Sequence, residues 1–133
     1  MFPKDERIVN YSIPQIVRES YDEAVRCEKA KAAIAVVVMV GRSLEAICKD
    51  FVPDSKTINS GLKMMKDNGF ISEELLEWSN ELRFLRNQGA HATSKKITLE
   101  DAEDSLDFLQ AILEILYHLR PRFKDIKNRR EQE

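Results

Sequence analysis

Residues 30–47 read AKAAIAVVVMVGRSLEAI, and this stretch decides the fold. Three consecutive valines, 36–38, favour a strand when taken alone, because β-branched side chains suit a pleated surface. The flanks favour a helix, since residues 30–35 are rich in alanine and residues 43–47 are helical in propensity and period. A helix that is apolar on all sides must be buried on all sides. We therefore expect a central, fully buried helix over residues 29–51, either separate from the helix before it or continuous with it.

Helix signals surround this central segment. Ser12 followed by Pro14 and Gln15 predicts a helix start with a serine cap and a capping-box glutamine. On the other side, a short helix is expected over residues 58–66, ended by Asp67-Asn68-Gly69. The segment before residue 58 contains Pro53, so the central helix should end near residue 52.

Two further helices are expected in the second half of the chain. Ser72 opens one of them, with an apolar seam of Leu75, Trp78, Leu82 and Leu85, and residues 89–96 form a break. Thr98, with Asp101 three residues on, caps the last helix, which we expect to run to about residue 119, before Pro121. That helix carries two apolar stripes, one with Ala102, Leu106, Leu109, Leu113 and Leu116, the other with Phe108, Ile112, Ile115 and Leu119. So wide a face fits either a dimer interface or one deep core helix.

Composition agrees with an all-α fold. The chain has 133 residues, only four glycines and four prolines, and 21 Lys plus Arg against 23 Asp plus Glu, a formal net charge of −2. This balance argues against a protein that coats long stretches of nucleic acid. We expect one domain over residues 1–133, an up-and-down bundle of four to five helices with a charged tail at 121–133 that either steers RNA or is a solvated end.

Location and redox state follow from equally simple features. Cys27 and Cys48 are too few for a disulfide scaffold, and on one continuous helix they would lie roughly 30 Å apart, so we expect two free thiols. The N-terminal residues are charged and lack an apolar signal core, and the longest apolar run, 32–40, is too short to span a membrane. We expect a soluble, cytoplasmic protein with no membrane partner.

Most catalytic signatures are missing from the sequence. It has no glycine-rich phosphate loop, no His-Glu-x-x-His and no cysteine pair at zinc spacing, so we expect neither a metal site nor a cofactor. What remains is the segment 85–91, LRNQGAH. Arg86 offers a planar cation suited to phosphate, and histidine is the residue type suited to general acid–base catalysis, so Arg86 and His91 together could cleave RNA without a metal. Alternatively, Arg86 pairs with a carboxylate and His91 packs the helix end.

Helical geometry constrains such a pair. Arg86 and His91 lie about 140° apart on an ideal helix, so one undistorted helix does not direct both side chains at one phosphate. Asn87 and His91 share a face with Arg83, which could bind an adjacent phosphate. Either the helix is distorted near Gly89, or a two-fold dimer brings two such segments around one cleft.

The segment Arg86-Asn87-x-x-x-His91 resembles the Arg-x4–6-His motif of the HEPN superfamily. Together with the segments 32–33, 41–46 and 100–102, in that order along the chain, it looks like a bacterial domain-of-unknown-function branch of that superfamily, DUF4145-like. The resemblance covers about residues 14–120. It implies a helical bundle that dimerises through the motif helices.

The resemblance also implies a function. Active members are metal-independent endoribonucleases that leave a 2′,3′-cyclic phosphate and a 5′-hydroxyl. Arg86 and His91 would be catalytic, Asn87 would orient His91 or the phosphate, and RNA would be the substrate of a homodimer. Such domains serve in toxin–antitoxin, restriction and anti-phage defence, with an antitoxin or defence protein as a possible partner. The alternative is a non-catalytic interaction, nucleotide-binding or nucleic-acid-binding module.

Overall fold

The described residues of the computed structural model, 7, 9, 11–91 and 96–132, form a bundle of helices. The helices are α1 (Gln15–Lys29), α2 (Ala33–Phe51), α3 (Ile58–Asp67), α4 (Glu73–Ala90), α5 (Leu99–Leu113), the π-helix η1 (Glu114–Leu119) and α6 (Arg120–Glu131). No strand occurs within these residues. The prediction of an all-α bundle is therefore confirmed.

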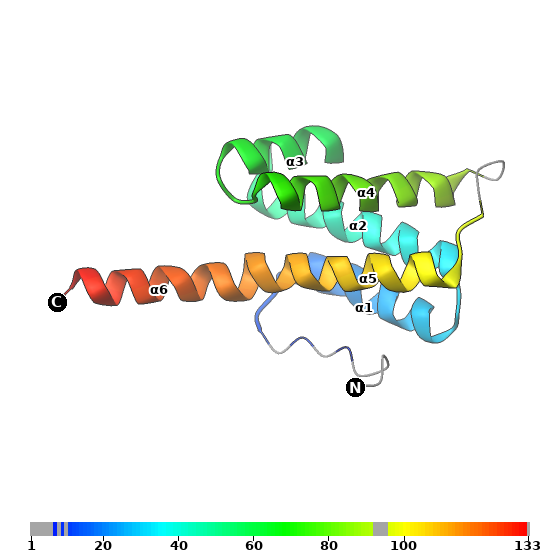
Figure 1. The fold of residues 1–133 in the computed structure, drawn as a ribbon, viewed down its shortest axis with the longest axis horizontal. Helices are drawn as coiled ribbons and strands as arrows, with labels where there is room; N and C mark the ends of the chain where they lie inside the picture. Colours follow the sequence, from blue (N-terminus) through cyan, green and yellow to red (C-terminus); the bar gives the residue numbers. More distant parts are fainter. Residues whose placement is uncertain (1–6, 8, 10, 92–95, 133) are drawn as a thin grey trace.

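Helix α2 is the central helix of the bundle. It packs against α1, α3, α4 and α5, which surround it in Figure 1. Val36, Val37 and Val40 are inaccessible to solvent and Val38 is half-buried, so the valine run is helical, as its flanks indicated, and lies mostly in the core. The expectation of a fully buried helix is wrong in both halves of α2. At its start 56% of Ile34 is exposed, and its second half exposes Arg42, Glu45, Lys49 and Asp50.

The chain turns between α1 and α2, so the two helices are separate. Lys31 adopts a left-handed backbone conformation with φ 58°, and the amide of Ala32 donates to the carbonyl of Cys27 at 2.9 Å. The helix pair packs closely side by side. Cys27 and Cys48 are both free thiols, as expected. The separation expected for them assumed one continuous helix, and the turn between α1 and α2 rules that helix out.

Local capping signals predict several helix ends correctly. The Ser72 side chain accepts from the Leu75 amide, Thr98 and Asp101 form a capping box, and Gly69 ends the α3 turn with φ 79°. Ser12, by contrast, caps nothing. Helix α1 begins at Gln15, because the carbonyl of Pro14 accepts the amides of Val17 and Arg18, each at 3.0 Å.

The predicted break at residues 89–96 starts at His91 rather than at Gly89, and the predicted helix end before Pro121 is wrong. Gly89 lies inside α4, where the missing side chain leaves room for a methyl group of Val37. The last helix continues through Pro121 to Glu131. The wide turns of η1 directly before it accommodate the proline ring, which a regular α-helical turn would press against the carbonyl of Tyr117.

Residues 99–131 therefore form one long helical rod, the α5–α6 rod, that crosses the bundle and projects beyond it (Figure 1). The first predicted stripe is its core face, since Ala102, Leu106, Leu109, Leu113 and Leu116 are at most 2% exposed. The second stripe is mixed. Ile112 is buried, whereas Phe108 and Leu119 are 42% and 48% exposed.

Arg7 ties the N-terminal segment to the bundle. Its guanidinium donates to both carboxylate oxygens of Glu28, each at 2.9 Å, to Gln110 at 3.0 Å, and lies 2.8 Å from Asp107. The Arg7 side chain is only 6% exposed and that of Glu28 9%. Burial opposes the charge of Arg7, but its hydrogen bonds to Glu28 and Asp107 outweigh that effect and raise its pKa. Arg7 thus connects α1 and α5.

Candidate functional site

A cleft of about 370 Å³ opens between the second half of α2, the start of α3 and α4. Four cations line it: Lys49 from α2, Lys56 from the α2–α3 loop, and Arg83 and Arg86 from α4. Glu45 is the only acidic side chain among the described lining residues. Four cations thus surround one cleft in a chain whose net charge is −2.

Arg86 is held in place from two sides. Its aliphatic stem packs on Gly41 of α2, so closely that a Cβ at position 41 would lie 2.2 Å from Cγ of Arg86. Its Nη1 donates to Oδ1 of Asn87 at 3.3 Å. The stem contact fixes the base of the side chain, and the amide steadies the guanidinium. Asn87 therefore orients Arg86, a role that the sequence did not predict.

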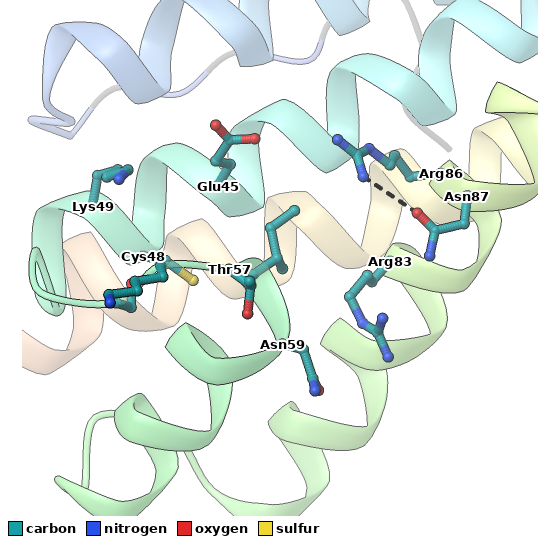
Figure 2. A pocket seen from close by; sticks show the side chains of 11 residues that line it. Glu45, Cys48, Lys49, Thr57, Asn59, Arg83, Arg86 and Asn87 are labelled. Carbon is teal, nitrogen blue, oxygen red and sulfur yellow. Dashed lines mark hydrogen bonds between the residues drawn. The ribbon is translucent and has the colours of Figure 1, made fainter.

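Arg83 lies one turn before Arg86 on the same helix. Figure 2 shows Asn87 between the side chains of Arg83 and Arg86, with Asn59 of α3 facing Arg83. The Nε–H of Arg83 is buried and donates to no acceptor within the described part of the chain. A buried donor without a partner is costly, and a phosphate or carboxylate oxygen is the acceptor that a guanidinium fits best.

His91 lies apart from the other predicted residues. It caps the C-terminal end of α4 with an extended backbone, is exposed to solvent and does not line the cleft. The distortion near Gly89 that could have brought it beside Arg86 is not found, because α4 is regular through Ala90. One chain thus brings Arg83, Arg86 and Asn87 together and leaves His91 at the open helix end.

The sequence pattern missed the other half of the cleft. Glu45, Lys49, Lys56 and Asn59 come from elements far from α4 along the chain. Gly41 offered one signal, since a glycine inside a helix is unfavourable by about 0.5–1 kcal/mol and often indicates that a neighbour approaches closely. No group of three or more His, Cys, Asp or Glu that could hold a metal ion occurs among the residues with described positions.

Cys48 lies at the cleft with its sulfur 2.8 Å from where a Cβ of Gly61 would be. Burial, followed by the charge of Glu45, raises the pKa of its thiol to about 11. Because the thiolate is the reactive form, we expect alkylation by iodoacetamide at pH 8 to be about 100-fold slower than for an unfolded chain. Mass spectrometry over time measures this rate. Modification of native Cys48 as fast as in urea would contradict it.

No described helix is both long and apolar enough to cross a membrane. The family model described as a domain of unknown function, DUF4145, matches residues 22–129. The matched segment contains all of α2, α3 and α4, hence the whole cleft. Comparisons with curated proteins and with solved structures gave no match.

Proposed function

The chain belongs to DUF4145, a family of domains of unknown function, and for this member we propose a metal-independent endoribonuclease activity of the HEPN type. The observation that carries the proposal is the cluster of Arg83, Arg86, Lys49 and Lys56 around one cleft, in a chain that has an exposed histidine outside that cleft at the end of the same α4. Focused cations suit a phosphodiester, and the low net charge limits binding to that place.

Arg86 stabilises the reaction centre. Its stem is held on Gly41 and its head by Asn87, so the guanidinium loses little freedom when it binds an oxygen of the scissile phosphate. A fixed cation of this kind stabilises the charge that develops on the phosphoryl oxygens in the transition state. Arg83, with its unused Nε–H, binds the neighbouring phosphate, and Lys49 and Lys56 attract the strand.

His91 moves the protons. In a homodimer joined through α4, the exposed His91 of one chain reaches the cleft of the other, which gives a composite site. One neutral imidazole takes the proton of the 2′-hydroxyl, the 2′-oxygen bonds to phosphorus, and the bond from phosphorus to the 5′-oxygen breaks. A protonated imidazole gives that leaving oxygen its proton. The products are a 2′,3′-cyclic phosphate and a 5′-hydroxyl.

The resemblance to the HEPN superfamily supplies the cellular setting of this proposal. It supports a cytoplasmic role in a bacterial toxin–antitoxin, restriction or anti-phage system, with an antitoxin or another defence protein as partner. The second candidate function is a non-catalytic module that binds a nucleotide or nucleic acid. The exposure of His91 outside the cleft favours it, because a single chain then has the phosphate-binding cations without the proton carrier.

Incubation of the purified protein with a mixed set of labelled RNAs in excess EDTA tests the proposal. We expect wild-type cleavage to persist in EDTA, to fall about 10²–10⁴-fold in His91→Gln, and to fall about 10²–10³-fold in Arg86→Met. Methionine keeps an aliphatic stem on Gly41, so folding should be retained. Lys63→Met, which removes an exposed cation of α3 outside the cleft, is the matched control and should cleave like wild type.

Binding separates the two candidate functions. RNA that binds wild type, loses affinity in Arg86→Met and is never cut indicates the non-catalytic module. Cleavage that survives in His91→Gln assigns the activity to a contaminant or to another site. If RNA is neither bound nor cut, the ribonuclease is wrong and the second function is wrong for RNA.

A further inference from the structure

The α5–α6 rod carries one apolar stripe that stays open to solvent along its length. Phe108, Leu119, Phe123 and Ile126 are 42%, 48%, 66% and 53% exposed. Ala111 and Ile115 lie between them and are half-buried. The successive steps 108, 111, 115, 119, 123 and 126 are three or four residues long, which is the spacing of one helix face.

The π-helix keeps this face continuous. The steps from Ile115 to Leu119 and from Leu119 to Phe123 are both four residues, which would drift on an α-helix of 3.6 residues per turn. Residues 114–119 form the wider turns of η1, so the step from Ile115 to Leu119 is close to one turn, whereas the step from Leu119 to Phe123 lies in α6 and shifts the stripe by about 40°. The rod therefore presents a single apolar line from α5 into α6.

Charge divides the rod into two halves. Helix α5 carries Glu100, Asp101, Glu103, Asp104 and Asp107 and has no Lys or Arg, whereas α6 carries six Lys or Arg against Asp125 and Glu131. An antiparallel copy of the same rod would match the acidic half of one chain with the basic half of the other. A two-fold axis makes such a contact self-complementary.

Beyond its first residue, Arg120, helix α6 is not covered by the described part of the chain. Every residue from Pro121 to Gln132 is exposed, and among the described helices α6 contacts only η1. Figure 1 shows it leaving the bundle, while α5 lies against the other helices. Phe123 and Ile126 thus expose two large apolar side chains on a projecting helix, and such a surface usually marks an interaction site.

We propose that the α5–α6 rod is a homodimer interface in which two copies pair antiparallel about a two-fold axis near Ile115. Residues whose numbers add to about 230 then lie opposite one another. Phe123 of one copy meets Phe108 of the other, whose ring lies 5.5 Å from that of Trp78. At the ends, Arg130 meets Glu100 and Lys127 meets Asp104.

An apolar groove lies next to the apolar stripe of the α5–α6 rod and could receive side chains of a partner. It has a volume of about 460 Å³, adjoins the rod at Ile115 and is lined by Phe70, Leu75 and Trp78, with Glu74 at its edge. Apolar side chains gain little from a phosphodiester strand, and the acidic α5 repels one, so the rod favours a second copy over RNA. The interface shares no residue with the cationic cleft. It is a second contact, separate from the α4 contact on which the ribonuclease proposal relies, and we expect the rod contact to hold the dimer in the absence of RNA.

Sedimentation velocity at about 50 µM tests the apolar part of this interface. We expect wild type to be a dimer and the double variant Phe123→Glu/Ile126→Glu to dissociate at least 100-fold more readily. Ile16→Glu on α1, where 56% of the side chain is exposed, is the matched control and should remain dimeric. A monomeric wild type, or a dimer that the double variant leaves intact, overturns the proposal.

A charge exchange tests the antiparallel direction. Lys127→Glu/Arg130→Glu makes the end of α6 acidic, and Glu100→Lys/Asp104→Lys makes the start of α5 basic. Each variant alone opposes like charges, so we expect at least 10-fold weaker dimers. A mixture of the two variants restores attraction at both ends and should give a heterodimer of wild-type strength. If mixing restores nothing, the pairing is not antiparallel and the proposal fails.

RNA binding is measured on the same proteins. If the variants with altered α6 dimerise normally but lose RNA affinity, the basic helix serves RNA, and the interface is wrong.

Discussion

Replacement of Gly41 by alanine is expected to destabilise the fold and to displace Arg86 from the cleft. The new methyl would lie 2.2 Å from Cγ and 2.9 Å from Cβ of Arg86, atoms too near the backbone of α4 to move away freely. Such overpacking costs about 1–3 kcal/mol. The better helix propensity of alanine offsets about 0.5–1 kcal/mol of that. Urea unfolding should show a net loss of about 1–2 kcal/mol, and RNA affinity should fall as in Arg86→Met.

A double-mutant cycle isolates the contact. In an Arg86→Ala background the atom nearest to the new methyl is gone, so Gly41→Ala should cost at least 1 kcal/mol less than in wild type. Gly69→Ala serves as the comparison, because a Cβ there meets nothing within 4 Å and only the left-handed backbone is strained. It should reduce stability without changing RNA affinity. Equal costs of Gly41→Ala in both backgrounds would show that Arg86 does not depend on Gly41.

Features set by neighbouring residues could be predicted from the sequence. The caps at Ser72 and Thr98 and the turn at Gly69 involve partners within a few residues, so their signals act locally. The opposite reason explains why the break predicted from Gly89 starts two residues later and why the helix end predicted before Pro121 is wrong. Gly89 packs against Val37 of another helix, and Pro121 follows a π-helix that the local sequence did not predict.

The residues of the candidate site also fall into a group that could be predicted from local sequence and a group that only the fold brings together. Arg83 and Asn87 lie four residues apart on one helix, so their spacing already indicated a common face, and Arg86 lies within one turn of both. Lys49 and Lys56 join them only because α2 and the loop after it pack beside α4, and charge counts along the sequence carry no such information. In our proposal His91 reaches the cleft of a second chain. The position of a second chain cannot be predicted from the sequence pattern of the first.

Loss of the buried guanidinium of Arg7 is expected to be the most destabilising single change. Arg7→Ala leaves the carboxylate of Glu28, only 9% exposed as a side chain, without its bidentate partner and removes the contacts to Gln110 and Asp107. Removal of one partner from a buried ion pair costs about 3–5 kcal/mol, because the remaining charge stays desolvated. Urea unfolding followed by circular dichroism at pH 7 measures the loss.

Two companion variants decide whether the buried charge is the cause. Glu28→Gln in the Arg7→Ala background neutralises the stranded carboxylate, so the double variant should recover at least 1 kcal/mol relative to Arg7→Ala. Asp107→Asn removes the partner that is 53% exposed and should cost less than 1 kcal/mol, as surface ion pairs do. If Glu28→Gln instead adds its own loss to that of Arg7→Ala, the carboxylate is not stranded in the single variant. Arg7 would then stabilise the bundle mainly through the packing of its stem between α1 and α5.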